Sequence, residues 1–122
     1  MEGSSFELVV KIYLKGEEEF FGPGPAQLLK LTQETRSINA ACKTMHMAYS
    51  KGWRMINRME KELGFRMLNR SAGGKSGGGS TLTEEGEKFL SLYMEMEREL
   101  KEKSAELFQR YFPIRLAPGA DS

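Results

Sequence analysis

The 122-residue chain has only one cysteine, Cys42, and one histidine, His46. A single cysteine excludes a disulfide within the chain, which is usual in a reducing cytoplasm. One cysteine and one histidine also fall short of the ligands of a Cys/His zinc site within one chain. Because no catalytic constellation can be assembled from these residues, we expect neither enzyme activity nor a cofactor.

Long apolar runs are absent as well. No stretch approaches eighteen consecutive apolar residues, so we expect no membrane-spanning helix. The N-terminal sequence MEGSSFELVV lacks the basic start and the long apolar run of a signal peptide. The balance of 39% apolar and 29% charged residues is that of a globular domain, and this length allows one modest core. The sequence therefore predicts one cytoplasmic domain with no membrane contact.

The net charge is only +1, but the charges are unevenly distributed. Residues 36–75 hold nine Lys or Arg against two acidic residues, a local balance of +7. Residues 1–35 hold three basic and six acidic residues, and residues 76–122 hold six and nine. A basic middle between acidic flanks indicates a surface for an anionic partner. The alternative is the solvated face of ordinary helices.

The predicted elements run from a β-hairpin through three helices to a second hairpin and a long helix. Residues 6–14, FELVVKIYL, are rich in β-branched and aromatic types and predict a strand, and Phe20-Phe21 is interpreted as a short returning strand. Helices are predicted over 25–35, over 38–45 after the N-cap Ser37, and over 48–63 before Gly64. The short break at His46-Met47 between two of these helices is typical of a helix-turn-helix.

The third predicted helix has two distinct faces. Gly52, Ile56, Met59 and Leu63 share the side that we expect in the core. Polar residues share the opposite side, and the first turn is where a recognition helix commonly meets base edges. Trp53 lies between the faces, where core-edge packing is favoured, and Tyr49 suits packing and base contact equally. The residues of this helix predicted to contact DNA are Tyr49, Ser50, Lys51, Arg54, Asn57, Arg58 and Lys61.

A glycine-rich segment with Lys75 at its centre follows a short predicted strand, 65–70, and precedes another, 80–82. Glycine backbone can approach an anion closely. Gly74-Lys75-Ser76 matches the end of a nucleotide-binding loop, but Asn69 stands where that motif needs its first glycine, and no helix follows. A flexible linker is the plain alternative. We favour a wing over residues 71–80, with Arg70 and Lys75 touching DNA phosphates.

A long helix is predicted at the end of the chain, over residues 83–112, with Thr83 as its cap. Apolar residues recur along it with heptad-like spacing, and Lys103 or Ser104 fills one missed position. A domain of this size is too small to cover such a helix, so we expect two copies to pair through it. The predicted homodimer residues are Phe89, Tyr93, Met96, Leu100 and Leu107, and residues 113–122 are predicted to form a flexible tail.

Two stretches carry a family resemblance. AYSKGWRMINRME, with the later SAGGKSGGGSTLTEEG, resembles the N-terminal DNA-binding domain of the molybdate-responsive ModE regulators, and MINRMEKELGFRMLNR with LTEEG is similar to LysR-type domains more broadly. The resemblance implies a mainly α winged helix-turn-helix with a small β content, an N-terminal hairpin and a dimerisation helix, together forming one domain over 1–112.

The same resemblance implies a transcriptional regulator that binds double-stranded DNA. ModE proteins typically carry further C-terminal domains for molybdate, which this chain lacks, so we expect no molybdate site within it. The alternative from another class is a winged-helix module that binds proteins and not DNA.

Overall fold

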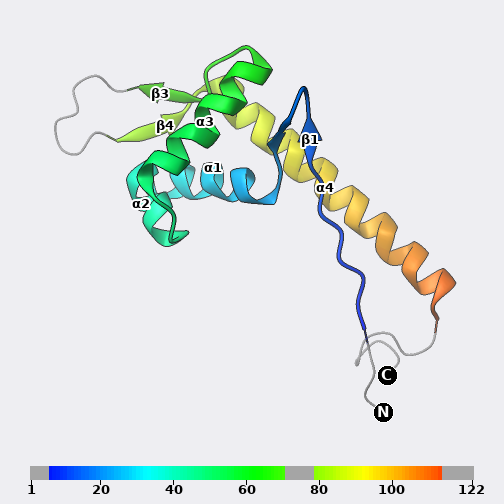
Figure 1. Cartoon of the computed structure of the whole chain (residues 1–122). Helices are drawn as coiled ribbons and strands as arrows, with labels where there is room; N and C mark the ends of the chain where they lie inside the picture. Colours follow the sequence, from blue (N-terminus) through cyan, green and yellow to red (C-terminus); the bar gives the residue numbers. More distant parts are fainter. Residues whose placement is uncertain (1–5, 71–78, 114–122) are drawn as a thin grey trace. The chain divides into compact units, whose positions relative to one another are not determined.

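The computed structural model describes residues 6–70 and 79–113. Figure 1 shows the elements in the order β1 (Leu14–Lys15), β2 (Glu19–Phe21), α1 (Pro23–Thr35), α2 (Ile38–Thr44), α3 (Tyr49–Leu63), β3 (Leu68–Arg70), β4 (Ser80–Leu82) and α4 (Glu84–Tyr111). This order confirms the predicted winged helix-turn-helix. The chain divides into two units: a helix-turn-helix unit, Ile12–Tyr93, and a terminal unit, Met1–Lys11 with Met94–Ser122.

The first hairpin is shorter than predicted. Strands β1 and β2 pair antiparallel, with Leu14 opposite Phe21, Lys15 opposite Glu19 and an irregularity between the two pairs. Residues 6–13 pair with no strand in the described chain, so the prediction of a strand over 6–14 was too long. A β-prone sequence forms a ladder only where a partner strand is available, and β2 is three residues long.

Helices α1 and α2 begin and end at recognisable signals. Pro23 and Pro25 occupy the first turn of α1, where their fixed φ suits the helix, and α1 starts two residues before the predicted Pro25. The helix ends at Arg36, which has a left-handed φ of 62° and donates its N–H to the Thr32 carbonyl at 2.7 Å. Ser37 caps α2 as predicted, because the Ala40 N–H donates to Ser37 Oγ at 3.0 Å.

Helix α3 ends at Gly64, whose φ of 83° favours glycine. Strand β3 then pairs antiparallel with β4 from Leu68 opposite Leu82 to Arg70 opposite Ser80. The two strands confirm the predicted second hairpin, although β3 covers only the last three residues of the predicted 65–70. The wing predicted over residues 71–80 lies outside the described residues, apart from its last two.

The core of the helix-turn-helix unit contains aliphatic side chains and a group of packed aromatic rings. Leu28, Leu29, Ile56, Met59 and Met67 are fully buried. The Phe21 ring packs edge-to-face on the Phe89 and Tyr93 rings, with centroids 4.9 and 4.8 Å apart. Both aromatic partners come from the first turns of α4, so this part of α4 belongs to the core.

Glycine is required where α2 meets α3. A Cβ on Gly52 would lie 2.4 Å from the Cys42 sulfur, well inside van der Waals contact. Cys42 is buried, and burial raises the pKa of its thiol. This placement fits the prediction that Cys42 is a small core residue.

Helix α4 starts in close contact with the segment before β3. The Gly86 N–H donates to Thr83 Oγ1 at 2.9 Å, which confirms Thr83 as the cap. A Cβ on Gly86 would lie 2.6 Å from the Met67 carbonyl oxygen, so the Leu-Thr-x-x-Gly sequence needs its glycine for packing. Among the described residues, no helix combines the length and apolar character needed to cross a bilayer.

Candidate nucleic-acid interface

The polar face of α3 is exposed along its whole length. Its predicted contact residues Ser50, Lys51, Arg54, Asn57, Arg58 and Lys61 are all exposed. The opposite side is fixed by the buried residues Gly52, Ile56 and Met59, because they hold α3 against the rest of the unit. The predicted residues are therefore brought together on one outward surface with four positive charges, which we call the α3 basic face.

Tyr49 and Trp53 form an aromatic pair beside this face. Their ring centroids lie 6.4 Å apart in an edge-to-face arrangement. Trp53 is half-buried and packs against the core, as predicted. Tyr49 is 51% exposed, so its ring is available to a partner while Trp53 supports it.

One of the two acidic residues in the basic stretch is engaged in structure. Glu60 Oε2 accepts hydrogen bonds from the backbone N–H groups of Met67 at 2.7 Å and Leu68 at 3.4 Å. A carboxylate that accepts two backbone donors holds the end of α3 to the segment that starts β3. Glu60 therefore links the end of α3 to the second hairpin.

The first hairpin borders the α3 basic face, which sequence reasoning did not foresee. Arg58 Nη1 lies 3.5 Å from Glu18 Oε1 at the turn of this hairpin. A surface cavity of about 240 Å³ lies between the two elements, and its polar lining includes Tyr13, Glu19, Lys51, Arg54 and Arg58. The acidic run Glu17–Glu19 facing a basic helix was the available signal. These acidic residues reduce the positive charge on the side of α3 that faces the first hairpin, compared with the side on which Asn57 lies.

The base of the second hairpin is tied to the end of α1. The Ser80 N–H donates to the Arg36 carbonyl at 2.9 Å, and a Cβ on Gly79 would lie 3.3 Å from the same oxygen. Asn69 Nδ2 adds a bond to Thr81 Oγ1 at 3.0 Å across the strands. Arg36 itself is exposed and was missed as a candidate. The backbone of Arg70 lies in β3, whereas its side chain and all of Lys75 lie outside what the structure describes.

The predicted dimer residues fall into two groups. Tyr93 is only 2% exposed, and its hydroxyl donates to the Ile12 carbonyl at 2.8 Å. Phe89 packs against Phe21 in the same core. Met96, Leu100 and Leu107, all beyond Tyr93, are 38%, 45% and 38% exposed. Only this second group is available to a second copy.

No metal site is evident in the part of the chain that the structure describes, where no three His, Cys, Asp or Glu residues are placed to hold an ion. The arrangement instead suits a polyanion, because exposed Lys and Arg side chains on one helix can reach phosphates while Ser and Asn reach base edges.

Comparison with known proteins decides the family. Residues 26–87, about half of the chain, match the bacterial regulatory helix-turn-helix proteins of the LysR family. The chain belongs to this family. The matched region runs from α1 to the start of α4, so it contains the α3 basic face and both strands of the second hairpin.

The chain is also similar to proteins named ModE. The chain is 37% identical over 92 residues to the transcriptional regulator ModE of Haemophilus influenzae, covering 75% of this chain and 36% of the relative. It is 32% identical over 85 residues to the DNA-binding transcriptional dual regulator ModE of Escherichia coli, covering 69% and 32%. The chain thus spans about a third of the length of these relatives. Both matches confirm the predicted resemblance to the N-terminal part of ModE.

A solved structure supports the fold. ArgP from Mycobacterium tuberculosis superposes with a TM-score of 0.53 at 21% identity, over 70% of this chain and 30% of that one. At this identity the likeness shows the fold alone. The LysR-family match and the ModE relatives agree with the predicted helix-turn-helix domain. They do not favour the alternative of a protein-interaction module without DNA binding.

Proposed function

We propose that this chain is a sequence-specific DNA-binding transcriptional regulator that inserts α3 into the major groove. The observation that carries the proposal is the α3 basic face, on which six predicted contact residues are exposed opposite a buried stripe. Arg54 lies at the centre of this face and is the first candidate for a bidentate contact with guanine. Ser50 and Asn57 lie on either side of it along the helix and suit hydrogen bonds to base edges.

Phosphate contacts would supply most of the affinity. Lys51, Arg58 and Lys61 are exposed cations on the same helix, and neutralised phosphates release counterions, so binding weakens steeply as salt rises. For the wing we propose that Lys75, and Arg70 at its base, touch the backbone or the adjacent minor groove. Lys75→Ala should then lower affinity for all sequences about equally. It should also reduce the slope of log affinity against log salt concentration by about one, the value expected for one lost phosphate contact.

We further propose a homodimer formed through the part of α4 beyond Tyr93. Met96, Leu100 and Leu107 recur on one side of the helix and are each more than a third exposed, which is unusual for large apolar side chains aligned on one helix face. Pairing of these helices would place two α3 helices at a fixed separation. The operator should accordingly be a near-palindrome with half-sites spaced by helical turns.

The relatives are about three times as long as the matched region. For this chain we propose only the DNA-binding step. A bacterial chromosome lies in the cytoplasm, which is the location we propose for the protein.

Two experiments test the proposal. Bound sequences are selected from a random duplex pool, and the most enriched sequence is then titrated by fluorescence at two salt concentrations. We expect an enriched near-palindrome that binds more tightly than a scrambled duplex, with affinity that falls as salt rises. No enrichment, together with no salt-dependent binding, would contradict DNA recognition. Lys88→Ala is the matched control for Lys75→Ala, because it removes an exposed cation from α4, outside the proposed interface. It should bind the selected sequence as the wild type does.

A further inference from the structure

Residues 6–11, FELVVK, form an extended segment with no strand partner. No backbone–backbone hydrogen bond joins this segment to any other residue that the structure describes. Its β-branched and aromatic residues favour a sheet, yet Val9 is 66% and Leu8 46% exposed. An exposed, β-prone segment with unpaired N–H and C=O groups is a template for another strand.

The segment is already held in place on one side, within the terminal unit. The Phe6 ring packs edge-to-face on Phe108 and Phe112 of the α4 end, with centroids 5.9 and 6.0 Å apart. A cavity of about 430 Å³ lies between residues 6–10 and the side of α4 that includes Ala105 and Phe108. The segment is therefore presented as an extended edge rather than as a free tail.

The exposed side of the segment is complementary to itself. In an extended chain alternate residues share a face, so Glu7, Val9 and Lys11 point the same way. Glu7 and Lys11 stand two residues before and two residues after Val9. An antiparallel copy centred on Val9 places each Glu7 opposite a Lys11 of the other copy and Val9 opposite Val9, which gives two ion pairs about a two-fold axis. Parallel pairing in register would place like charges together.

We infer that residues 7–11 pair with the same residues of a second copy as an antiparallel ribbon whose two-fold axis passes through Val9. This inference rests on the proposed homodimer and deepens it. The ribbon belongs to the same unit as the exposed Met96, Leu100 and Leu107. It would fix the axis about which the α4 helices pair, and with it the half-site spacing, which a smooth apolar stripe leaves open.

Oxidative cross-linking of the full chain in a Cys42→Ala background tests the register. Val9→Cys should form a disulfide dimer, because residues opposite each other in an antiparallel pair have Cα atoms about 4.5 to 5.5 Å apart, within the range of a disulfide. Glu7→Cys alone and Lys11→Cys alone should not cross-link, since each lies four residues, about 13 Å, along the ribbon from its own copy. A mixture of the two variants should cross-link.

Sedimentation of the reduced wild type separates the two ideas. A dimer in which Val9→Cys fails to cross-link overturns the ribbon and leaves the helix-paired homodimer standing. Cross-linking of Glu7→Cys alone shows a parallel or unregistered contact and also overturns it. A wild-type monomer overturns the homodimer and the ribbon together. As a readout without cysteine, Glu7→Lys should raise the dimer Kd about tenfold, and Glu7→Lys/Lys11→Glu should restore it.

Discussion

Two helices of this protein carry an apolar stripe, but they use it differently. In α3 the stripe of Gly52, Ile56 and Met59 is buried by the chain's own residues. In α4 beyond Tyr93 the residues Met96 and Leu100 are 38% and 45% exposed. An amphipathic pattern therefore predicts that a helix has a face to cover, and only the tertiary contacts tell whether the chain covers that face itself.

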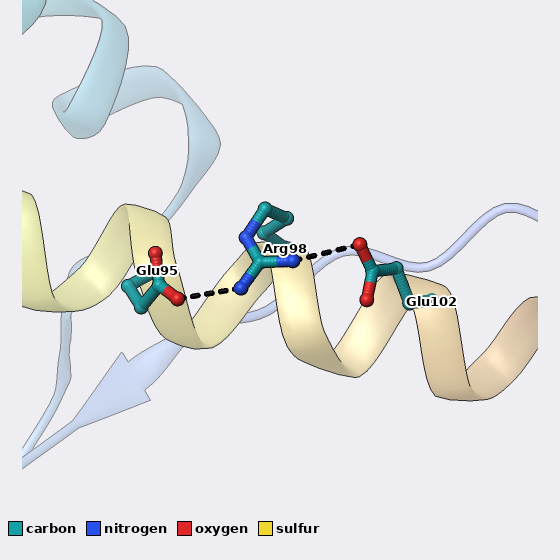
Figure 2. A network of polar contacts seen from close by, with 3 residues as sticks. All are labelled: Glu95, Arg98 and Glu102. Atoms are coloured by element: carbon teal, nitrogen blue, oxygen red, sulfur yellow. Dashed lines mark hydrogen bonds and ion pairs between the residues drawn. The ribbon is translucent and has the colours of Figure 1, made fainter.

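The charged residues of the two helices show the opposite difference. In the described chain, Lys51, Arg54 and Lys61 of α3 make no ion pair, and Arg58 reaches Glu18 at 3.5 Å. In α4, Arg98 bonds to Glu95 at 2.5 Å and to Glu102 at 2.7 Å, as Figure 2 shows. These hydrogen bonds raise the pKa of Arg98 above its ordinary value. Among the described residues, α3 thus leaves three of its four cations without an ion pair, whereas α4 pairs Arg98, Lys101 and Lys103 with carboxylates of the same helix.

Leu100→Asp should have the largest effect, because it places a carboxylate in the middle of the exposed stripe of α4. We expect monomers, since a buried unpaired charge at the centre of a helix pair is costly. Operator affinity should fall about 100-fold or more, as two linked half-sites become separate binding events. Sedimentation velocity and a gel-shift titration measure the two effects.

Ser91→Asp is the matched control for this change, because it adds the same group at an exposed position on another side of α4. It should remain dimeric. A wild-type sedimentation profile for Leu100→Asp would refute helix pairing and leave the exposed stripe without a role.

Arg54→Ala tests the other half of the comparison, the cations of α3. Loss of a contact to a base should weaken specific binding by about 1–3 kcal/mol, roughly 5- to 150-fold, and relax preference at one operator position. The side chain is exposed and makes no ion pair with a described residue, so folding should not change. Unchanged operator affinity in a titration would remove Arg54 from the interface.

Gly52→Ala tests how tightly the apolar stripe of α3 is held. A methyl group 2.4 Å from the Cys42 sulfur forces either this sulfur or the packed helices to shift, and overpacking of this kind costs about 1–3 kcal/mol of the free energy of unfolding. Chemical denaturation measures it. Cys42→Ala should recover part of the loss in the double variant, and Gly24→Ala, whose Cβ would meet nothing within 4 Å, should cause none. Equal losses in the double and single variants would exclude the sulfur clash.

The sequence signals that succeeded are local ones. Ser37, Gly64 and Thr83 mark helix ends because each acts within a few residues of its own backbone. The features that the sequence did not predict all concern distant partners. The length of β1 depends on what β2 offers, the burial of Tyr93 depends on Phe21 and Ile12, and the contact of Glu18 with Arg58 joins elements 40 residues apart. No periodicity within one element encodes such contacts, so the α3 basic face was predictable but its border with the hairpin was not.

The smallest expected effect comes from Arg98→Met, which removes the centre of the α4 ion-pair network. The hydrogen bond from Arg98, followed by its charge, holds the pKa of Glu95 below its usual range. A carboxylate whose folded-state pKa is lowered stabilises the fold at pH values above its unfolded pKa, and the contribution disappears as the pH falls through the lowered value.

Because the side chains of Arg98 and Glu95 are both exposed, solvent and salt screen their interaction, and its contribution to stability is small. In Arg98→Met the Glu95 pKa should return upward in an NMR titration, while thermal stability at neutral pH, dimerisation and operator affinity change little. If instead dimerisation weakened, the network would belong to the contact between copies, and the contrast between a helix that offers its cations to a partner and one that neutralises them internally would fail.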